Sequence, residues 1–242
     1  MLKKNIIYSS LFSQFAFTLA ETLIVMSIIG VVAALTLPNL NSSTGDKEKV
    51  AKVKKIYQNL NDAFDRAQAV YGPFDEWCQN ISDFNDCNIK ASERMIEFMK
   101  ILKKCGNEKN KGCFSDKIYL MDKSGSNPGF DNSDWYKVIL EDGTSFCLYA
   151  PIGMLITDID GPNKGENAYN KDTFMFNIKD NTLLPDGTGT YSGDFSKSQC
   201  VASTACTAWV IQYGNMDYLK VGSDDKCSDG TKLNWSTKTT CK

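Results

Sequence analysis

The longest hydrophobic pattern in the chain is an apolar segment near its amino end. From Phe17 to Leu37 the chain runs for 21 residues with one charged side chain, Glu21. At about 1.5 Å per residue, a helix of this length covers roughly 30 Å, the thickness of a bilayer's hydrocarbon core. Lys3 and Lys4 precede the segment and indicate a cytoplasmic amino end. The pattern therefore predicts a membrane-spanning helix over residues 17–38.

A second pattern, with helical spacing, follows the apolar segment. Apolar side chains recur at steps of three and four residues from Val50 to Tyr71, and Gly72-Pro73 ends the series. This spacing predicts an amphipathic helix within residues 39–72 whose apolar stripe is covered by another layer. The small, polar stretch 39–45 is typical of a turn and predicts an interruption before it. The lysines between residues 47 and 55 indicate either a solvated face or a surface attracted to anionic lipid headgroups.

The remainder of the chain predicts one further helix and a set of strands. Apolar residues at helical spacing, together with helix stop signals, predict a helix at residues 92–104. Residues 141–144 are typical of a hairpin turn between two of the strands. Residues 207–213 fit either a strand or a short buried helix. The strands are expected at residues 117–121, 135–140, 145–150, 154–158 and 173–178.

Composition and charge narrow the classes of function. Hydrophobic residues make up 42% and charged residues 23% of the chain, as in ordinary folded proteins. The 27 basic and 29 acidic residues give a net charge of −2, which disfavours bulk nucleic-acid binding. The chain contains no histidine, which excludes Ser-His-Asp and Cys-His nucleophiles and His-ligated metals. An enzyme is therefore not expected.

Nine cysteines indicate an oxidising compartment. Pairing of sequence neighbours would give four short disulfide loops and leave Cys147 as a buried free thiol. A structural zinc cluster is the alternative, although the close spacings typical of zinc sites are missing. The neighbouring pairs are Cys78 with Cys87, Cys105 with Cys113, Cys200 with Cys206, and Cys227 with Cys241.

A glycine-containing acidic loop carries side-chain oxygens of the kind that calcium prefers. Gly161-Pro162 departs from the order of an EF-hand, so a polar turn without metal is the default interpretation. Calcium is the alternative and the one candidate cofactor. The candidate ligands are Asp158, Asp160, Asn163, Glu166 and Asp172.

The segment from Ala16 to Met26, Ala-Phe-Thr-Leu-Ala-Glu-Thr-Leu-Ile-Val-Met, resembles the prepilin cleavage and methylation segment of type IV pilins and type II secretion pseudopilins. The resemblance implies a leader of residues 1–16, cleavage between Ala16 and Phe17, and methylation of the Phe17 amine. The family usually has glycine where this chain has Ala16. The resemblance extends to Gly30, where pilin helices often loosen, and to Pro38, where many kink.

The resemblance also implies a role for Glu21 in assembly. A carboxylate in lipid costs about 2.5–3.5 kcal/mol on insertion scales, so it favours a cationic partner. In the family this partner is the methylated amine of a neighbouring subunit, here that of Phe17. The alternative is that Glu21 lies in the headgroup zone of a lone membrane anchor.

Fold, location and function follow as expectations from the same resemblance. The expected fold is α+β and pilin-like: a long amino-terminal helix, with a membrane half and an amphipathic half, packed on an antiparallel sheet in a disulfide-bonded head at residues 73–242. The protein is expected in the inner membrane as a single-pass chain with an extracytoplasmic head. Its expected partners are other pilin subunits, a prepilin peptidase and inner-membrane lipid.

The expected function is that of a structural subunit of a type IV pilus or a type II secretion pseudopilus. Residues 71–77, 158–165, 172–174 and 206–219 resemble stretches of large-headed pilin-like proteins, which favours a minor subunit. The alternative is a membrane-anchored extracytoplasmic binding protein, an adhesin or a DNA-uptake pilin. In that case exposed aromatic residues such as Trp135, Trp209 or Trp235 would contact the partner, although burial in the core is the commoner fate of each.

Overall fold

The computed structural model describes residues 19–108, 111–128, 130, 134–201 and 204–241, and for residues 33–44 it describes the backbone alone. The chain divides into two compact units, residues 1–45 and 46–242.

One helix, α1, runs from Leu19 to Tyr71 and therefore belongs to both units. The predicted interruption at residues 39–45 is wrong, because the helix continues through them. Relative to Ala, Asn, Ser and Thr each cost a helix up to about 0.7 kcal/mol and Gly about 1 kcal/mol, which weakens the helix without ending it. Within the described residues, no helix combines the length and the apolar character needed to cross a membrane. The predicted span over 17–38 lies partly outside the described residues and stays a prediction.

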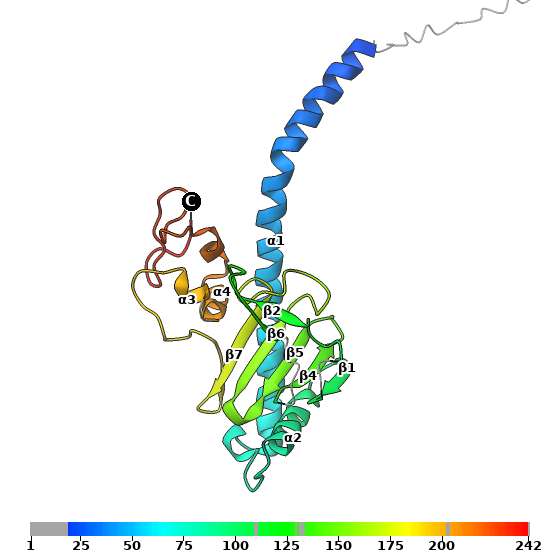
Figure 1. Cartoon of the computed structure of the whole chain (residues 1–242), viewed down its shortest axis with the longest axis vertical. Helices are drawn as coiled ribbons and strands as arrows, with labels where there is room; N and C mark the ends of the chain where they lie inside the picture. The colour runs from blue at the N-terminus through cyan, green and yellow to red at the C-terminus, as the bar shows by residue number, and fades with distance from the viewer. Residues whose placement is uncertain (1–18, 109–110, 129, 131–133, 202–203, 242) are drawn as a thin grey trace, which may run out of the picture. The chain divides into compact units, whose positions relative to one another are not determined.

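The second unit is an α+β fold built on an antiparallel sheet of six strands in the order β1-β4-β5-β6-β7-β8 (Figure 1). Four of these strands were expected within a residue or two, whereas β1 and β8 were not. The region expected at 117–121 forms β2 (Lys117–Tyr119), which pairs in a separate hairpin with β3 (Ser126–Pro128). The strands of the main sheet are β1 (Ile101–Gly106), β4 (Tyr136–Leu140), β5 (Ser145–Tyr149), β6 (Met154–Asp158), β7 (Thr173–Lys179) and β8 (Thr182–Pro185).

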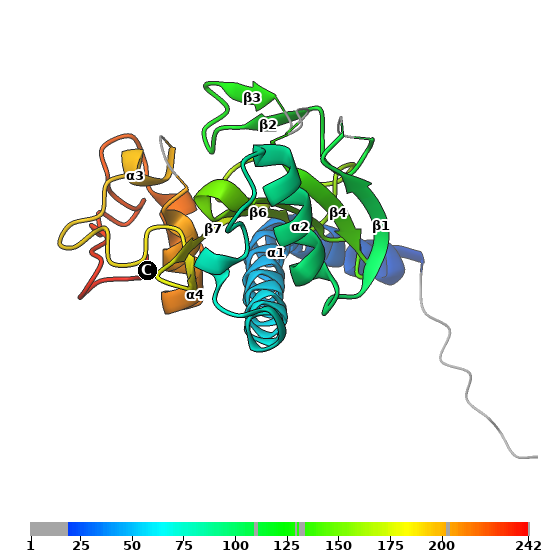
Figure 2. The same cartoon turned by 90° about the horizontal axis from the view of Figure 1, so that it is seen from below.

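The two faces of this sheet are covered by different elements (Figure 2). Successive side chains of a strand point to opposite faces, so alternate residues belong to different cores. On the helix-covered face, Phe146, Phe174 and Phe176 join one core with the apolar stripe of α1. The ring of Tyr57 on α1 stacks on Phe176 with centroids 5.5 Å apart, and the Tyr57 hydroxyl donates to the Leu183 carbonyl. The predicted amphipathic helix and its covering layer are thus confirmed.

The opposite face, called here the hairpin-covered face, lies under the β2–β3 hairpin and the loops that flank it. Its strand residues alternate with those of the first core, and its apolar cluster is much smaller. Cys147 and Ile156 from the sheet pack there against Ile118 of β2. The other buried members of the cluster are Cys105, Cys113, Phe114, Phe130 and Tyr169.

The helix expected at 92–104 is only partly correct. Helix α2 spans Phe84–Ile96, and the residues after it form β1 instead. The helix starts earlier than expected because Asp83 caps it, with its carboxylate accepting from the Asp86 amide at 3.0 Å. Residues Ile101–Gly106 instead form main-chain hydrogen bonds with β4.

The carboxyl-terminal part of the chain lies beside β7 and carries two short helices. Helix α3 spans Ser198–Val201 and α4 spans Cys206–Tyr213, which decides the open choice for residues 207–213 in favour of a helix. Single-turn 3-10 helices lie at Phe74–Glu76, Ala150–Ile152 and Asp217–Lys220.

The outer strands of the main sheet are irregular or short. Strand β1 pairs with β4 through two register shifts and exposes Lys103 and Lys104. Strand β8 has four residues and ends at Pro185.

Candidate functional site

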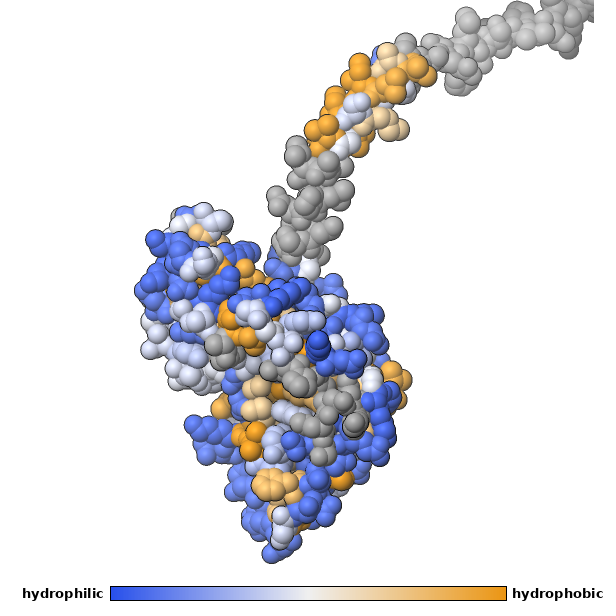
Figure 3. All heavy atoms as spheres, in the orientation of Figure 1, coloured by the Kyte–Doolittle hydropathy of each residue, from blue (hydrophilic) through white to orange (hydrophobic). Residues whose placement is uncertain are grey.

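The first described turns of α1 form an exposed apolar surface (Figure 3). Glu21 lies in the first turn, where the helix dipole favours a negative charge. The large apolar side chains of this segment are between 54% and 80% exposed. A contiguous apolar surface of this kind marks contact with lipid or with another protein. The exposed residues are Leu19, Leu23, Ile24, Val25, Met26, Ile28, Ile29, Val31 and Val32.

The other residues of the predicted assembly segment are only partly described. Ala16 and Phe17 lie outside the described residues. Gly30 lies within α1, and a side chain at this position would meet no atom within 4 Å. The backbone of α1 continues past Pro38. The predicted loosening at Gly30 and kink at Pro38 stay predictions.

The acidic loop joins β6 to β7 at one end of the sheet, and three of its predicted ligands are held close together. Asp158 is the last residue of β6, and its Oδ1 accepts from the Gly161 amide at 3.0 Å. Asp172 directly precedes β7, and its carboxylate accepts from the amides of Asn167 at 2.9 Å and Ala168 at 2.7 Å. These backbone bonds fix both carboxylates at the base of the loop.

Gly165 allows a third carboxylate to join this group. Its φ is +70°, and a Cβ there would lie 2.4 Å from Asp172 Oδ2 and 2.7 Å from Asp160 Oδ2. Asp160 and Asp172 therefore meet at a point that only glycine leaves open. Burial, the charge of Asp172 and the proximity of Asp160 raise the pKa of Asp158 to about 9. Burial likewise raises the pKa of Asp172, against the opposing effect of its backbone donors.

The other two predicted ligands have different surroundings. Glu166 bridges Lys123 and Lys171, each at 2.9 Å. Partial burial works to raise the pKa of Glu166, but these two ammonium groups lower it to about 2. Asn163 is exposed. Over the part of the chain that the structure describes, no three Cys, Asp or Glu side chains are arranged to hold a metal ion by themselves.

Two hydroxyl side chains outside the predicted ligand set lie beside Asp158. Ser145 on β5 and Thr173 on β7 are its direct cross-strand neighbours, so all three point to the hairpin-covered face. Each of the three residues is fully buried. An unpaired buried polar group costs about 1–3 kcal/mol, so such a row is unusual. Only the strand register places these residues together, and no local sequence signal indicates it.

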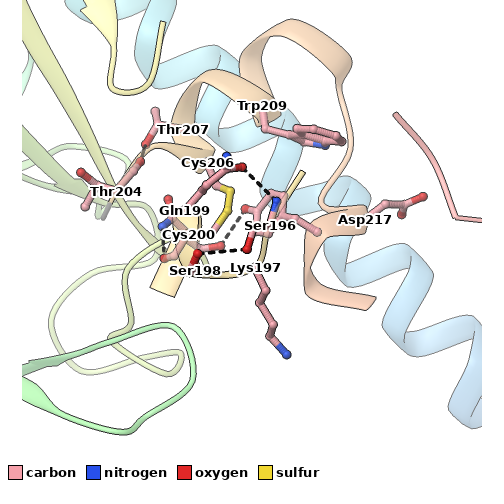
Figure 4. Close-up of a disulfide and its surroundings, with 12 residues drawn as sticks. Ser196, Lys197, Ser198, Gln199, Cys200, Thr204, Cys206, Thr207, Trp209 and Asp217 are labelled. Carbon is pink, nitrogen blue, oxygen red and sulfur yellow. Dashed lines mark hydrogen bonds between the residues drawn. A yellow bond between two sulfur atoms is a disulfide. The ribbon is translucent and has the colours of Figure 1, made fainter. Parts of the chain in front are cut away.

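The four predicted local disulfides are confirmed, and they leave Cys147 as the free cysteine. The alternative of a zinc cluster is therefore wrong, because eight cysteines are already bonded. The Cys200–Cys206 bond ties α3 to the start of α4 (Figure 4). Beside it, Gln199 Oε1 accepts from the Ser196 amide at 3.1 Å and from the Trp235 indole at 2.9 Å. These contacts stabilise the fold and present no reactive group.

Cys147 has the surroundings of an inert thiol. It is fully buried and pairs across the strands with Lys137, which is also fully buried. Burial raises the pKa of the Cys147 thiol, although the charge of Lys137 opposes the shift. The Lys137 ammonium donates to the Trp135 carbonyl at 2.8 Å.

The lysines between residues 47 and 55 contact groups of the same unit. Lys52 pairs with Glu48 at 3.1 Å and Lys55 with Asp142 at 3.3 Å. The ammonium of Lys54 lies beside Gly214, which follows the last residue of α4. Much of this charge is therefore compensated within the head, and the region gives little support to a lipid-binding surface.

The aromatic residues proposed as partner contacts are mostly internal. Trp209 is fully buried and Trp235 is 6% exposed, with their rings 4.8 Å apart. Trp135 is half-buried against Phe130 and Tyr149. Trp209 and Trp235 therefore have the more common fate, burial in the core, and the alternative that they are exposed contacts is wrong.

A surface groove of about 980 Å³ lies between α2 and the end of α1. Its charged groups largely satisfy one another. The Arg94 guanidinium lies 4.9 Å above the Tyr71 ring, and the Tyr71 hydroxyl bonds Glu97. Glu93 accepts from the Tyr136 hydroxyl and pairs with Lys104. The groove thus has no evident ligand chemistry.

Comparison of the chain with family models, curated proteins and solved structures found no match.

Proposed function

We propose that this chain is a structural subunit, and a minor one, of a filament of the type IV pilus or type II secretion pseudopilus class. The observation that supports the proposal most is the start of α1, where large apolar side chains are exposed and Glu21 occupies the first turn. The motif from Ala16 to Met26, which includes Glu21, supports the same proposal.

The exposed apolar side chains require a cover before and after assembly. Lipid provides it in the precursor, and helices of neighbouring copies provide it in a filament. Glu21 makes the second arrangement selective, because a carboxylate among apolar side chains is stabilised by a nearby cation. Cleavage before Phe17 would create that cation on each copy.

The head has features that suit a position outside the cytoplasm. Four disulfides are typical of proteins that fold in an oxidising compartment. The apolar stripe of α1 within residues 50–71 is packed into the core of the same unit. In a filament, a force applied along α1 would therefore reach the folded head through a large apolar contact.

Processing gives the first test. The full chain is produced in membranes together with a prepilin peptidase, and the intact mass of the product is measured. We expect loss of residues 1–16 and the addition of a methyl group at Phe17. Replacing Ala16 with a bulky residue (Ala16→Leu) is expected to block the cut. A product that still starts at Met1 in the presence of active peptidase would contradict the proposal.

Assembly gives the second test. Glu21→Ala is expected to reduce incorporation into sheared filaments at least tenfold, corresponding to the loss of about 1.4 kcal/mol or more of pairing energy. Glu48→Ala is the matched control, since Glu48 is an exposed carboxylate on the same helix that pairs only locally with Lys52. Parental incorporation of Glu21→Ala would count against the proposed pairing.

A further inference from the structure

A second surface groove, of about 540 Å³, lies at the end of the head where α1 finishes. Its walls are the 3-10 helix that follows α1, the connection between β5 and β6, and the turn between β7 and β8 (Figure 1). The volume is within the range of about 300–1,000 Å³ that is typical of ligand sites. We call it the Phe74 groove, and its apolar side chains are those of Phe74, Ala150, Pro151, Ile152 and Ile178.

Hydrogen bonds hold the three walls of the Phe74 groove together. The Asp75 amide donates to the side-chain oxygen of Asn181 at 3.0 Å, which joins the 3-10 helix to the β7–β8 turn. The Gln68 side-chain amide on α1 donates to the Asn181 carbonyl at 3.3 Å. The Ile178 amide donates to the Gly153 carbonyl at 2.6 Å, which joins β7 to the β5–β6 connection. A partner would therefore meet a preformed surface and lose little affinity to ordering it.

The chain segments around the groove carry an uncompensated negative charge. Residues 72–90 and 178–182 contain five carboxylates and two ammonium groups, a net charge of −3, whereas the whole chain has −2. The carboxylates are those of Asp75, Glu76, Asp83, Asp86 and Asp180. Within the described residues, none of the five forms an ion pair. Charge complementarity therefore favours a cationic partner at this end of the head.

Arginine is the cation that fits the Phe74 groove best. Its guanidinium is planar and weakly hydrated, stacks on aromatic rings, and bonds to carboxylates through two N–H groups at once. Phe74 provides a half-buried ring, and the exposed carboxylates of Asp75 and Asp180 line the same groove. Ile152 is 56% exposed, so it can cover the apolar stem of the arginine or an apolar neighbour.

We infer that the Phe74 groove binds a segment of a partner protein in which an arginine lies beside apolar residues. The guanidinium pairs with Asp75 and Asp180, and the apolar neighbours cover Ile152 and Ile178. The surrounding carboxylates attract the segment before contact, which raises the rate of association. The groove belongs to the folded head, so this inference goes beyond the proposed filament function and does not depend on it.

Binding is tested on the full chain in a non-ionic detergent with a fluorescein-labelled peptide of three Arg-Leu repeats. Fluorescence anisotropy should show saturable binding above the background of empty micelles. Binding should weaken between about 20 mM and about 300 mM sodium chloride, because salt screens exposed charges. A peptide with citrulline in place of arginine keeps the shape without the charge, and it should bind about fivefold more weakly or worse.

A pair of charge variants locates the peptide. Asp75→Asn combined with Asp180→Asn removes both carboxylates of the groove and should weaken binding about fivefold or more. Asn also tolerates the positive φ of +50° at position 180. The matched control is Asp65→Asn combined with Asp116→Asn, which changes the net charge equally at exposed positions outside the groove. The control should bind the peptide like the parent.

A second pair of variants tests the apolar contact. Ile152→Ala should weaken peptide binding about threefold or more, because it removes exposed apolar surface from the groove. Leu102→Ala removes a similarly exposed apolar side chain on β1 and should leave binding unchanged. Thermal melting of all four variants should match the parent, which shows that a loss of binding is not a loss of folding.

Four results would overturn the inference. They are a parent that shows no saturable binding, equal binding of the citrulline peptide, parental binding by the variant without Asp75 and Asp180, and an equal loss in the control without Asp65 and Asp116. Carbodiimide cross-linking with peptide mapping addresses another occupant. A link from Asp75 or Asp180 to a second copy of the chain would assign the groove to self-association instead. None of these results bears on leader cleavage or on Glu21, so the proposed filament function is tested separately.

Discussion

The two faces of the six-stranded sheet are both buried, but they are built from different side chains. On the helix-covered face, phenylalanines and leucines of the strands meet the apolar stripe of α1. On the hairpin-covered face, the same strands bury Lys137, Ser145, Asp158 and Thr173 beside a small apolar cluster. Burial alone therefore does not define a core, because one face holds the fold together and the other also encloses polar and charged groups.

The largest loss of stability is expected from a substitution in the core of the helix-covered face. Phe146 is fully buried in its core, so Phe146→Ala should lower the free energy of unfolding by about 3–5 kcal/mol. Leu102→Ala is the control and should change it by less than about 0.5 kcal/mol, since Leu102 is 66% exposed. Urea unfolding followed by circular dichroism measures both. A smaller effect of Phe146→Ala than of Leu102→Ala would refute this assignment of the core.

A smaller loss of stability is expected when a disulfide on the hairpin-covered face is removed. Replacing Cys105 and Cys113 together with serine removes a disulfide of the hairpin-covered cluster and should cost about 2–3 kcal/mol. It should also admit reagents to Cys147, whose raised pKa and burial otherwise keep it an unreactive neutral thiol at pH 8.

Alkylation with iodoacetamide and mass spectrometry report that access. Removal of the Cys78–Cys87 bond, which lies in the helix-covered core, is the control and should leave Cys147 protected. Equal labelling of Cys147 in both double variants would show that the two faces open together.

The buried lysine tests whether the polar character of the second face is needed. Lys137→Met keeps a long side chain but leaves the Trp135 carbonyl without its donor. The expected loss of stability is about 1–3 kcal/mol by urea unfolding. Lys179→Met, at the exposed end of β7, should leave stability unchanged. Increased stability of Lys137→Met would mean that an apolar residue serves this face better.

The smallest change in stability is expected when a buried hydroxyl is removed, and its sign should depend on whether that hydroxyl is paired. Thr173→Val removes an unpartnered buried hydroxyl, so in EDTA stability should stay equal or rise by up to about 1 kcal/mol. Thr207→Val should lower it by about 1 kcal/mol, because the Thr207 hydroxyl accepts from the Met175 amide and donates to the Thr204 carbonyl. Matched thermal melts of the two variants decide the comparison, and equal losses would show that Thr173 is paired after all.

The helix-covered face was largely predictable from sequence, because its elements follow local rules. Strand β6 has the bounds expected from its pattern, and the turn at 141–144 connects β4 and β5. Strand β1 was missed because residues 92–104 keep helical spacing, whereas pairing with β4 decides their structure beyond Ile96. Tertiary hydrogen bonding thus overrode local propensity.

The candidate cation site was only partly predictable. The aspartates of the acidic loop stand out in the sequence, but Ser145 and Thr173 gain their meaning only from the register of β5, β6 and β7. Glu166 was predicted to be a ligand, but it pairs with Lys171 in the same loop and with Lys123, which is distant in sequence. Strand register and, for Lys123, long-range pairing are not visible in the sequence.

The irregular outer strands of the sheet have a consequence for crowded surroundings. The register shifts and lysines of β1, and the proline that ends β8, are features that discourage main-chain pairing between sheets of separate molecules. Copies held side by side at high local concentration would thus resist fusing into amyloid-like ribbons. Each head would remain an individually folded body that can be added or withdrawn without unravelling its neighbours.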